Sequence, residues 1–249
     1  MNVLAIDIGN TRIKWGWHQD GAWVRQGWVL TAQAVDLAAD LGVAAAAERI
    51  VISNVAGEVV RAQVAAALRD AAARPQWITS AAAQCGVRSG YADPATLGTD
   101  RWAALIGAWR LTGAACVVVN VGTTMTVDAL DSEGVFLGGC IVPGMELMRG
   151  ALARDTANLA ARDGIFRYFP DNTGDAIASG VVNALAGTVE RMVGYLRESA
   201  GVAPQVVLSG GGVELIEKQL NAPVMVVDNL VLEGLLQMVQ PSADGMNSG

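Results

Sequence analysis

Two short segments of the chain place glycine and threonine directly after a run of apolar residues. They are Asp7-Ile8-Gly9-Asn10-Thr11 and Asn120-Val121-Gly122-Thr123-Thr124. A strand that runs directly into glycine lets a tight hairpin bring backbone N–H groups close to a phosphate, and Asn10 and Thr11 add side-chain donors. An ordinary hairpin turn explains one copy. Two copies favour a pair of phosphate-binding turns that clamp a nucleoside triphosphate between them.

Charged residues accompany the first of these segments. Asp7, at the end of its apolar run, is placed where a carboxylate holds Mg²⁺ through water, and Lys14 adds a positive charge on the returning strand. The second segment has Asp128 a few residues further on, where either a role near Mg²⁺ or an ordinary hairpin carboxylate fits the pattern.

A third group of polar residues lies between Tyr91 and Trp102. Asp100 can accept a proton from a substrate hydroxyl, and Arg101 can bind a substrate carboxylate through two parallel N–H···O bonds. The same residues also suit the start of a helix, with Thr99 and Asp100 as caps and Arg101 in solvent. The residues alone leave both interpretations open.

A glycine-rich turn, Ser209-Gly210-Gly211-Gly212, follows a later apolar run. Such a turn lets a flat ring approach the backbone and places a helix N-terminus near a phosphate, although many turns of this kind are only structural. The chain contains neither GxGxxG nor GxxxxGK[ST], so the Rossmann and P-loop interpretations fail on motif.

Hydrophobic periodicity predicts the elements that must position these residues. In the first half, the order is β-β-β-α-β-α-β, followed by a loop and a helix. The predicted segments are Val3–Ile8, Ile13–Trp17, Trp23–Val29, Thr31–Leu41, Ile50–Ser53, Glu58–Ala73, Trp77–Ile78, the loop 81–98 and Asp100–Leu111.

The second half restarts the same pattern after residue 115. Its predicted segments are the strands Cys116–Val121, Met125–Leu130 and Val135–Ile141, a helix after Pro143, the helix Thr173–Ser199, the strand Val206–Leu208, a helix to Leu220, the strand Val224–Val227 and the helix Asn229–Met238. The repeated order indicates an internal duplication. We therefore expect an α/β protein with domains at residues 1–113 and 114–240 and a disordered tail at 241–249.

Composition excludes several classes of protein. Of the 249 residues, 52% are hydrophobic and 16% are charged, which is typical of a folded chain with a large core. The net charge of −7 argues against nucleic-acid binding. No window offers about 18 consecutive apolar residues, so no membrane span is predicted. The single histidine, His18, lies far from any serine motif, which argues against a Ser-His-Asp hydrolase.

The cysteines and the first residues predict a cytoplasmic location. Cys85, Cys116 and Cys140 are scattered without a CxxC pair, as expected of thiols in a reducing compartment. Charged residues interrupt the first apolar run before it could form a signal peptide.

The motifs together resemble those of the actin-like ATPase superfamily of acetate and sugar kinases, Hsp70 and actin. More narrowly, the chain is similar to the type III pantothenate kinases over residues 1–238. The most specific element is Gly98-Thr99-Asp100-Arg101 with Tyr91 seven residues before the glycine. The other matching segments are Asp7–Lys14, Val119–Asp128 and Asn172-Thr173.

This resemblance implies both a fold and a reaction. The fold is a pair of actin-like (ribonuclease H-like) domains, each a mixed sheet with helices on both faces, with an ATP cleft between them. The reaction is ATP-dependent phosphorylation of pantothenate to 4'-phosphopantothenate, the first step of coenzyme A biosynthesis. Phosphoryl transfer needs mainly positioning and charge stabilisation, which agrees with the scarcity of histidine.

The resemblance also assigns roles to residues. Asp100 is the general base, Arg101 pairs with the substrate carboxylate, Thr123 contacts ATP and Asp7 faces Mg²⁺. Thr173 reaches pantothenate from the neighbouring protomer of a homodimer. The pantothenate-binding set is Tyr91, Gly98, Thr99, Asp100, Arg101 and Thr173. The first phosphate loop consists of Asp7, Ile8, Gly9, Asn10, Thr11, Arg12, Ile13 and Lys14.

One position departs from the family pattern. The family usually has aspartate where this chain has Asn120, and that aspartate binds a monovalent cation, K⁺ or NH₄⁺. An amide oxygen is a weaker cation ligand than a carboxylate. We therefore expect weak K⁺ activation together with dependence on Mg²⁺.

Two other functions fit the same fold. One is a kinase of another small hydroxylated acid or sugar, and the other is a nucleotide-binding regulator without catalysis. A degenerate regulator is expected to lose Asp100 or Arg101, and the chain retains both.

Overall fold

The computed structural model describes residues 1–42, 46–157, 159, 163–201 and 203–240. The chain forms two compact units, which we describe separately. Unit 1 is Met1–Leu111 together with Leu230–Gly249, and unit 2 is Thr112–Asn229. The tail predicted at 241–249 lies outside the described residues.

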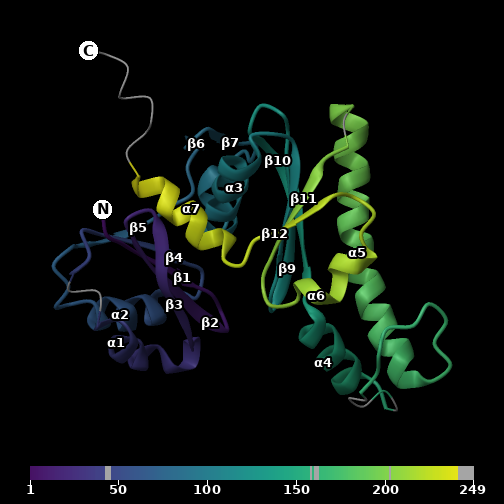
Figure 1. Ribbon diagram of the computed structural model, residues 1–249. Coiled ribbons are helices and arrows are strands. Elements are labelled where there is room, and N and C mark those ends of the chain that lie inside the picture. Colours follow the sequence, from purple (N-terminus) through teal and green to yellow (C-terminus); the bar gives the residue numbers. More distant parts are fainter. Residues whose placement is uncertain (43–45, 158, 160–162, 202, 241–249) are drawn as a thin grey trace. The chain divides into compact units, whose positions relative to one another are not determined.

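Unit 1 is built on a mixed sheet with the strand order β3-β2-β1-β4-β5 (Figure 1). The central strand β1 pairs antiparallel with β2 and parallel with β4. Its strands are β1 (Val3–Ile8), β2 (Arg12–Gln19), β3 (Ala22–Leu30), β4 (Arg49–Asn54) and β5 (Pro75–Trp77). The unit also contains the hairpin of β6 (Ala83–Gln84) and β7 (Val87–Ser89). Its helices are η1 (Thr31–Asp36), α1 (Leu37–Asp40), α2 (Glu58–Ala67), η3 (Pro94–Thr96), α3 (Thr99–Thr112) and α7 (Leu230–Val239).

Both faces of this sheet are covered, which explains why β1 is buried along its whole length. Leu4, Ile6 and Ile8 point to one face, where they share a hydrophobic cluster with Val64 of α2. Alternate residues of a strand point to opposite faces, so Asp7 lies on the other face of β1. Helix α7 contacts β1 and β4.

The β2–β3 hairpin turns at Asp20-Gly21. Both residues have positive φ, 51° and 88°, which is the geometry of the two-residue hairpin turn that suits strand twist. Trp15 and Trp17 of this hairpin are buried, as expected of core residues, whereas Trp28 is exposed.

Unit 2 repeats the strand arrangement of unit 1, in the order β10-β9-β8-β11-β12. Here β8 pairs antiparallel with β9 and parallel with β11. Its strands are β8 (Cys116–Val121), β9 (Thr124–Leu130), β10 (Val135–Pro143), β11 (Gln205–Ser209) and β12 (Val224–Val226). Its helices are α4 (Met145–Asp155), α5 (Thr173–Ala200), α6 (Val213–Ile216) and η4 (Glu217–Gln219).

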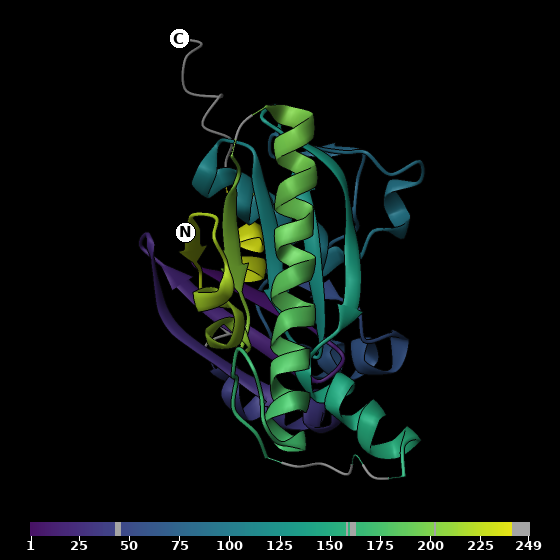
Figure 2. The ribbon, with the colours of Figure 1, turned by 90° about the vertical axis from the view of Figure 1, so that its right-hand side faces the viewer.

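The long helix α5 covers one face of the unit 2 strands (Figure 2). The Asn172 side chain caps its start by accepting the Asp175 N–H at 2.9 Å, and Gly201 ends it in the left-handed conformation. Leu185, Val189 and Val193 are buried in one cluster with the strands.

The last helix differs from its predicted place. The sequence pattern assigned it to the second half, but α7 belongs to unit 1. Close packing explains why it can sit there. A Cβ at Gly234 would collide with the Ala103 backbone of α3, and a Cβ at Gly107 would lie 2.7 Å from the Leu230 carbonyl oxygen. The two glycines therefore let the backbones of α3 and α7 approach directly.

Other segments also depart from the predicted elements. The helix predicted over Glu58–Ala73 ends at Ala67. Thr31–Leu41 forms η1 followed by α1 because Gln33 leaves helical geometry, with φ −114° and ψ 28°. The predicted loop 81–98 contains the β6–β7 hairpin, which turns at Cys85 and Gly86 with positive φ. Cysteine seldom adopts positive φ, so the residues at this turn did not predict a hairpin.

Candidate active site

The first phosphate turn joins β1 to β2 in unit 1. The Gly9 N–H donates to the Arg12 carbonyl oxygen at 3.0 Å and closes the turn. The Thr31 hydroxyl donates to the Gly9 carbonyl oxygen at 2.7 Å and so ties the turn to the end of β3. Asn10, Thr11 and Arg12 are exposed at its tip, where a ligand can reach them.

Strand pairing sets three polar residues in one row beside this turn. Lys14 of β2 is opposite Asp7 of β1, and Asp7 is opposite Ser53 of β4. The Asp7 side chain is nine-tenths buried, and among the described residues its Oδ1 atom has no hydrogen-bond partner. Burial, together with the Asp100 carboxyl, raises the pKa of Asp7 to about 7, whereas Lys14 and the Ser53 hydroxyl act to lower it.

Helix α3 carries the second group of predicted site residues. Its first helical bond runs from the Trp102 N–H to the Gly98 carbonyl oxygen. The Asp100 carboxylate accepts the Arg101 backbone N–H at 2.8 Å. Burial raises the pKa of Asp100, and the Arg101 backbone and guanidinium oppose that rise. A Cβ at Gly98 would lie 2.6 Å from Asp100 Oδ1, so glycine at 98 leaves room for this carboxylate.

Arg101 is buried, and this corrects the alternative interpretation that placed it in solvent. Its side chain is only 7% exposed, and its Nη1 donates to the Tyr91 hydroxyl at 3.3 Å. The guanidinium also lies 5.9 Å from the centre of the Tyr91 ring. The structure thus brings Tyr91, Asp100 and Arg101 together, as the motif predicted.

The Thr99 hydroxyl faces β4. It lies 3.0 Å from Ser53 Oγ and accepts the Asn54 backbone N–H at 3.2 Å. The alternative interpretation had Thr99 as a cap of its own helix. The hydroxyl instead bonds to β4, so it does not serve as that cap. Sequence reasoning missed Ser53 and Asn54. The available signal was that β4, parallel to β1, must end beside Asp7.

The second phosphate turn lies in unit 2, between β8 and β9. The Gly122 N–H donates to the Thr124 carbonyl oxygen at 3.0 Å, and the Thr123 carbonyl oxygen accepts the Gly144 N–H at 2.9 Å. Thr123 and Thr124 are exposed. Gly210, with φ 103°, packs against Val121 and Asn120 at the start of the glycine-rich turn.

Thr173 occupies a different part of unit 2. It opens α5 and lines an apolar groove of about 740 Å³ formed mainly by α4 and α5. The groove walls include Leu147, Leu152, Ala176 and Gly180.

Among the residues that the structure describes, no helix is long and apolar enough to cross a bilayer. Those residues also contain no cluster of three or more His, Cys, Asp or Glu side chains arranged to hold a metal.

The duplicated mixed sheets define the class of the protein, which has the actin-like ATPase fold. The solved structure of MreB 5 of Spiroplasma citri bound to AMPPNP has a similar fold, with a TM-score of 0.52 at 10% identity over 94% of each chain. The sequence profile of type III pantothenate kinases matches residues 3–194.

Curated relatives agree with this profile over nearly the whole length. The type III pantothenate kinase of Nitrosospira multiformis is 45% identical, covering 99% of this chain and 94% of the relative. That of Aromatoleum aromaticum is 46% identical, covering 97% and 99%. The chain belongs to the type III pantothenate kinase family.

Proposed function

We propose that this protein transfers the γ-phosphoryl group of ATP to the primary hydroxyl of pantothenate, giving 4'-phosphopantothenate and ADP as the first step of coenzyme A biosynthesis. The observation that carries the proposal is the start of α3, where a half-buried Asp100 carboxyl adjoins the buried Arg101 guanidinium and Tyr91. A substrate with a carboxylate at one end and a hydroxyl at the other matches this pair.

Arg101 is the residue that binds the substrate carboxylate. A guanidinium offers donors in a fixed fork that fits a carboxylate, and burial makes this pairing stronger than it would be in water. The Tyr91 hydroxyl, bonded to Arg101 Nη1, fixes the plane of the guanidinium. Gly98 serves the site by leaving space for the Asp100 carboxylate.

Asp100 accepts the proton of the attacking hydroxyl. As the pantothenate oxygen bonds to the γ-phosphorus, the bond to the ADP oxygen breaks and the hydroxyl proton passes to the Asp100 carboxylate. The raised pKa of Asp100 makes it a better proton acceptor than an exposed aspartate.

The residues around Asp7 fit a Mg²⁺ ion. The fit rests on the buried Oδ1 atom without a hydrogen-bond partner, in a carboxyl whose pKa is raised by burial and by Asp100. A bound cation gives the Oδ1 atom a partner and stabilises the ionised carboxylate against burial and the nearby Asp100 carboxyl. When bound, Mg²⁺ neutralises the charge that develops on the transferred phosphoryl group.

The two turns contribute donors to the nucleotide phosphates. In unit 1 these come from the loop of Asp7 to Lys14, and in unit 2 from Thr123. Their exposed, glycine-containing tips support this assignment.

The functional assembly is a homodimer with shared sites. Thr173 lines the apolar α4–α5 groove, and α5 exposes small residues, Ala176, Gly180 and Gly187, at helical spacing. A second copy of α5 can approach such a face closely. Light scattering should report a dimer, and an active monomer would contradict this assignment.

Subunit mixing tests the shared site directly. Asp100→Asn and Thr173→Ala should each be inactive alone. In a mixed dimer, one site then combines an intact Asp100 with an intact Thr173 from the other subunit, so random mixing should restore about a quarter of wild-type activity. No recovery on mixing would place Thr173 in the site of its own chain.

The substrate is tested by coupled ADP release with pantothenate, other hydroxy acids and a panel of sugars. Pantothenate should be the preferred acceptor, and mass spectrometry should show one added phosphoryl group. Preference for a sugar would indicate another kinase of this fold. Binding of ATP without turnover on any acceptor would indicate a nucleotide-binding regulator.

A further inference from the structure

Ser53 is a fully buried polar residue at the end of β4. Its side chain is 0% exposed, and the parallel register places it directly beside Asp7. The Ser53 hydroxyl is hydrogen-bonded to the Asp7 carboxyl, which is one of the effects that act to lower the pKa of Asp7. A buried hydroxyl in this position needs partners, because a buried polar group without a hydrogen bond destabilises the fold.

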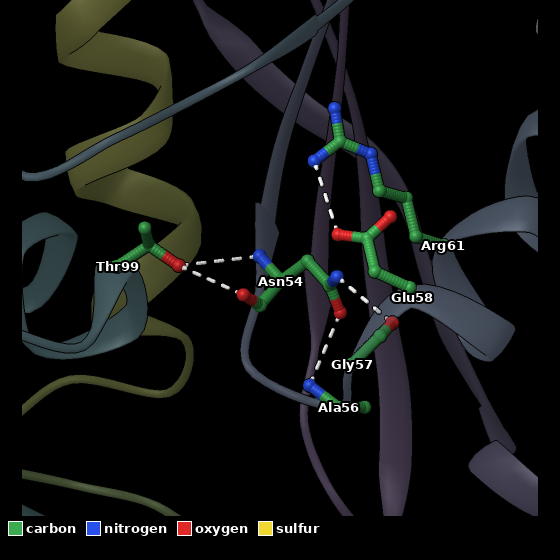
Figure 3. Close-up of polar contacts among 6 residues, drawn as sticks. All are labelled: Asn54, Ala56, Gly57, Glu58, Arg61 and Thr99. Carbon is green, nitrogen blue, oxygen red and sulfur yellow. Dashed lines mark hydrogen bonds and ion pairs between the residues drawn. The ribbon is translucent and has the colours of Figure 1, made fainter.

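The second partner of Ser53 is the first residue of α3. Ser53 Oγ and Thr99 Oγ1 are 3.0 Å apart. Figure 3 shows the Thr99 hydroxyl also facing the Asn54 backbone, with the nitrogen at 3.2 Å and the carbonyl oxygen at 3.4 Å. One threonine therefore joins the N-terminus of α3 to the last two residues of β4.

The end of β4 is itself held firmly. The Asn54 side chain accepts the Ala56 N–H at 3.1 Å and donates to the Gly57 carbonyl oxygen at 3.2 Å (Figure 3). The turn into α2 is thus fixed from within. Movement of Thr99 relative to β4 must break bonds to a rigid partner.

The hydroxyls of Ser53 and Thr99 share one hydrogen bond in which either oxygen can be the donor. Thr99 Oγ1 also accepts the Asn54 N–H. The contacts form a continuous chain from the Asp7 carboxylate to the residue that precedes Asp100.

We propose that Ser53 is a positioning residue, which with Thr99 fixes the first turn of α3 relative to Asp7 and so sets the place of Asp100 and Arg101. The inference rests on the proposed function, since it concerns the geometry between the metal-facing carboxylate and the base. It also assigns the Thr99 hydroxyl to positioning, whereas the family resemblance placed Thr99 among the substrate contacts.

Ser53→Ala and Thr99→Val test the proposal. Each removes one hydroxyl from the chain and adds no charge. Because small misplacement of reacting groups costs up to about 100-fold in rate, kcat should fall by about 10–100-fold in both variants. The KM values for pantothenate and ATP should stay within about twofold, since no substrate contact is removed.

Two further variants separate positioning from general destabilisation. Thr99→Ser keeps the hydroxyl and should retain most of kcat. Val64→Ala is the matched control, because it removes buried volume from unit 1 without altering the hydroxyl chain. It should lower the melting temperature and leave kcat per folded molecule unchanged. The double variant Ser53→Ala/Thr99→Val should be little slower than either single variant, because both break one link.

Several outcomes would overturn the proposal. They are an equal loss of kcat in Thr99→Ser and Thr99→Val, additive losses in the double variant, or a loss that Val64→Ala reproduces. Amide hydrogen exchange in the absence of substrate gives a readout independent of turnover. Ser53→Ala should accelerate exchange at residues 101–103, and unchanged exchange there would contradict the positioning role. If wild-type protein does not phosphorylate pantothenate, the proposed function fails, whereas the exchange result still tests the link.

Discussion

Each unit has a row of three paired residues at the corresponding place in its sheet, and the two rows differ in charge. In unit 1 the row is Lys14, Asp7 and Ser53 across β2, β1 and β4. In unit 2, β9, β8 and β11 place Thr126, Asn120 and Ser209 in the corresponding row. The two units therefore share the strand arrangement, and of these two rows only that of unit 1 contains ionisable side chains.

The two serines show how closely the frames correspond. Ser53 connects the end of β4 to Thr99, the first residue of α3. Ser209, at the end of β11, donates to the Asp228 carbonyl oxygen at 3.4 Å, two residues before α7 begins. Each serine thus contacts the chain at or just before the start of a helix, which is α3 for Ser53 and α7 for Ser209.

Helices α3 and α7, both of which belong to unit 1, also begin with different residues. α3 begins with Thr99-Asp100-Arg101, whereas α7 begins with Leu230-Val231-Leu232. The catalytic groups that we propose thus lie in unit 1, while the turn of unit 2 offers neutral donors. Substitutions that add or remove charge in one unit test this division.

The largest expected effect comes from Asp100→Asn. The change keeps the shape of the side chain and removes the proton acceptor, so kcat should fall by about 10²–10⁴-fold. Single-turnover kinetics should locate the loss in the chemical step. Turnover near the wild-type rate would leave Asp100 as a residue that only organises the start of α3.

Asp7→Asn gives unit 1 the amide that unit 2 already has. The variant should need about 10–100-fold more Mg²⁺ for half-maximal activity, because a neutral oxygen replaces a carboxylate beside the ion. A Mg²⁺ titration at saturating pantothenate measures this change. An unaltered Mg²⁺ requirement would place the ion elsewhere.

The same substitution should also change stability with pH. The pKa of Asp7 is about 7 in the fold against an ordinary value of 3.8, so the unfolded chain gives up this proton first. Wild-type stability should therefore decline as pH rises from about 4 to 7. In Mg²⁺-free buffer, the melting temperature of Asp7→Asn should rise relative to wild type over that window and stay level above it. Parallel pH dependence of the two proteins would argue against the raised pKa.

Arg101→Lys keeps the charge of α3 and removes the fork. Charge-assisted hydrogen bonds contribute about 1.5–3 kcal/mol, so the KM for pantothenate should rise by about tenfold or more. Isothermal titration should show ATP binding nearly unchanged. An equal loss of affinity for ATP would make Arg101 a phosphate ligand or a structural residue.

Asn120→Asp makes the reciprocal change in unit 2 and should have the smallest effect. We expect the natural protein to respond weakly to K⁺, and the added carboxylate should strengthen the response to K⁺ or NH₄⁺. Titration of KCl against a large organic-cation chloride at fixed ionic strength measures it. Strong K⁺ activation of the natural protein, unchanged by Asn120→Asp, would place the cation site elsewhere.

Sequence patterns predicted the repeated frame because each half has the same run of apolar strands and a glycine at the same turn. The grouping of Tyr91 with Asp100 and Arg101 came from the family resemblance, because the residues alone left two interpretations open. Sequence patterns did not predict that Ser53 and Thr99 meet, because this contact depends on the register between β1 and β4 and on where α3 begins. The burial of Arg101 was likewise open, because one arginine at a helix start fits either solvent or a core.

The place of α7 depends on packing that no local pattern records. Gly107 and Gly234 permit its close crossing with α3. A glycine inside a helix is a weak indicator of close helix packing in a sequence, because glycine lowers helix propensity whether or not another helix packs against it.

The return of α7 to unit 1 also bears on the order in which the chain can fold as it leaves the ribosome. Residues that complete unit 1 are synthesised last, after all of unit 2. Strands β1 and β4 thus emerge early, and more than two thirds of the chain is translated between β4 and their covering helix α7. Unit 2 is continuous in sequence and can finish first, so the unit that begins the protein is the last to be closed.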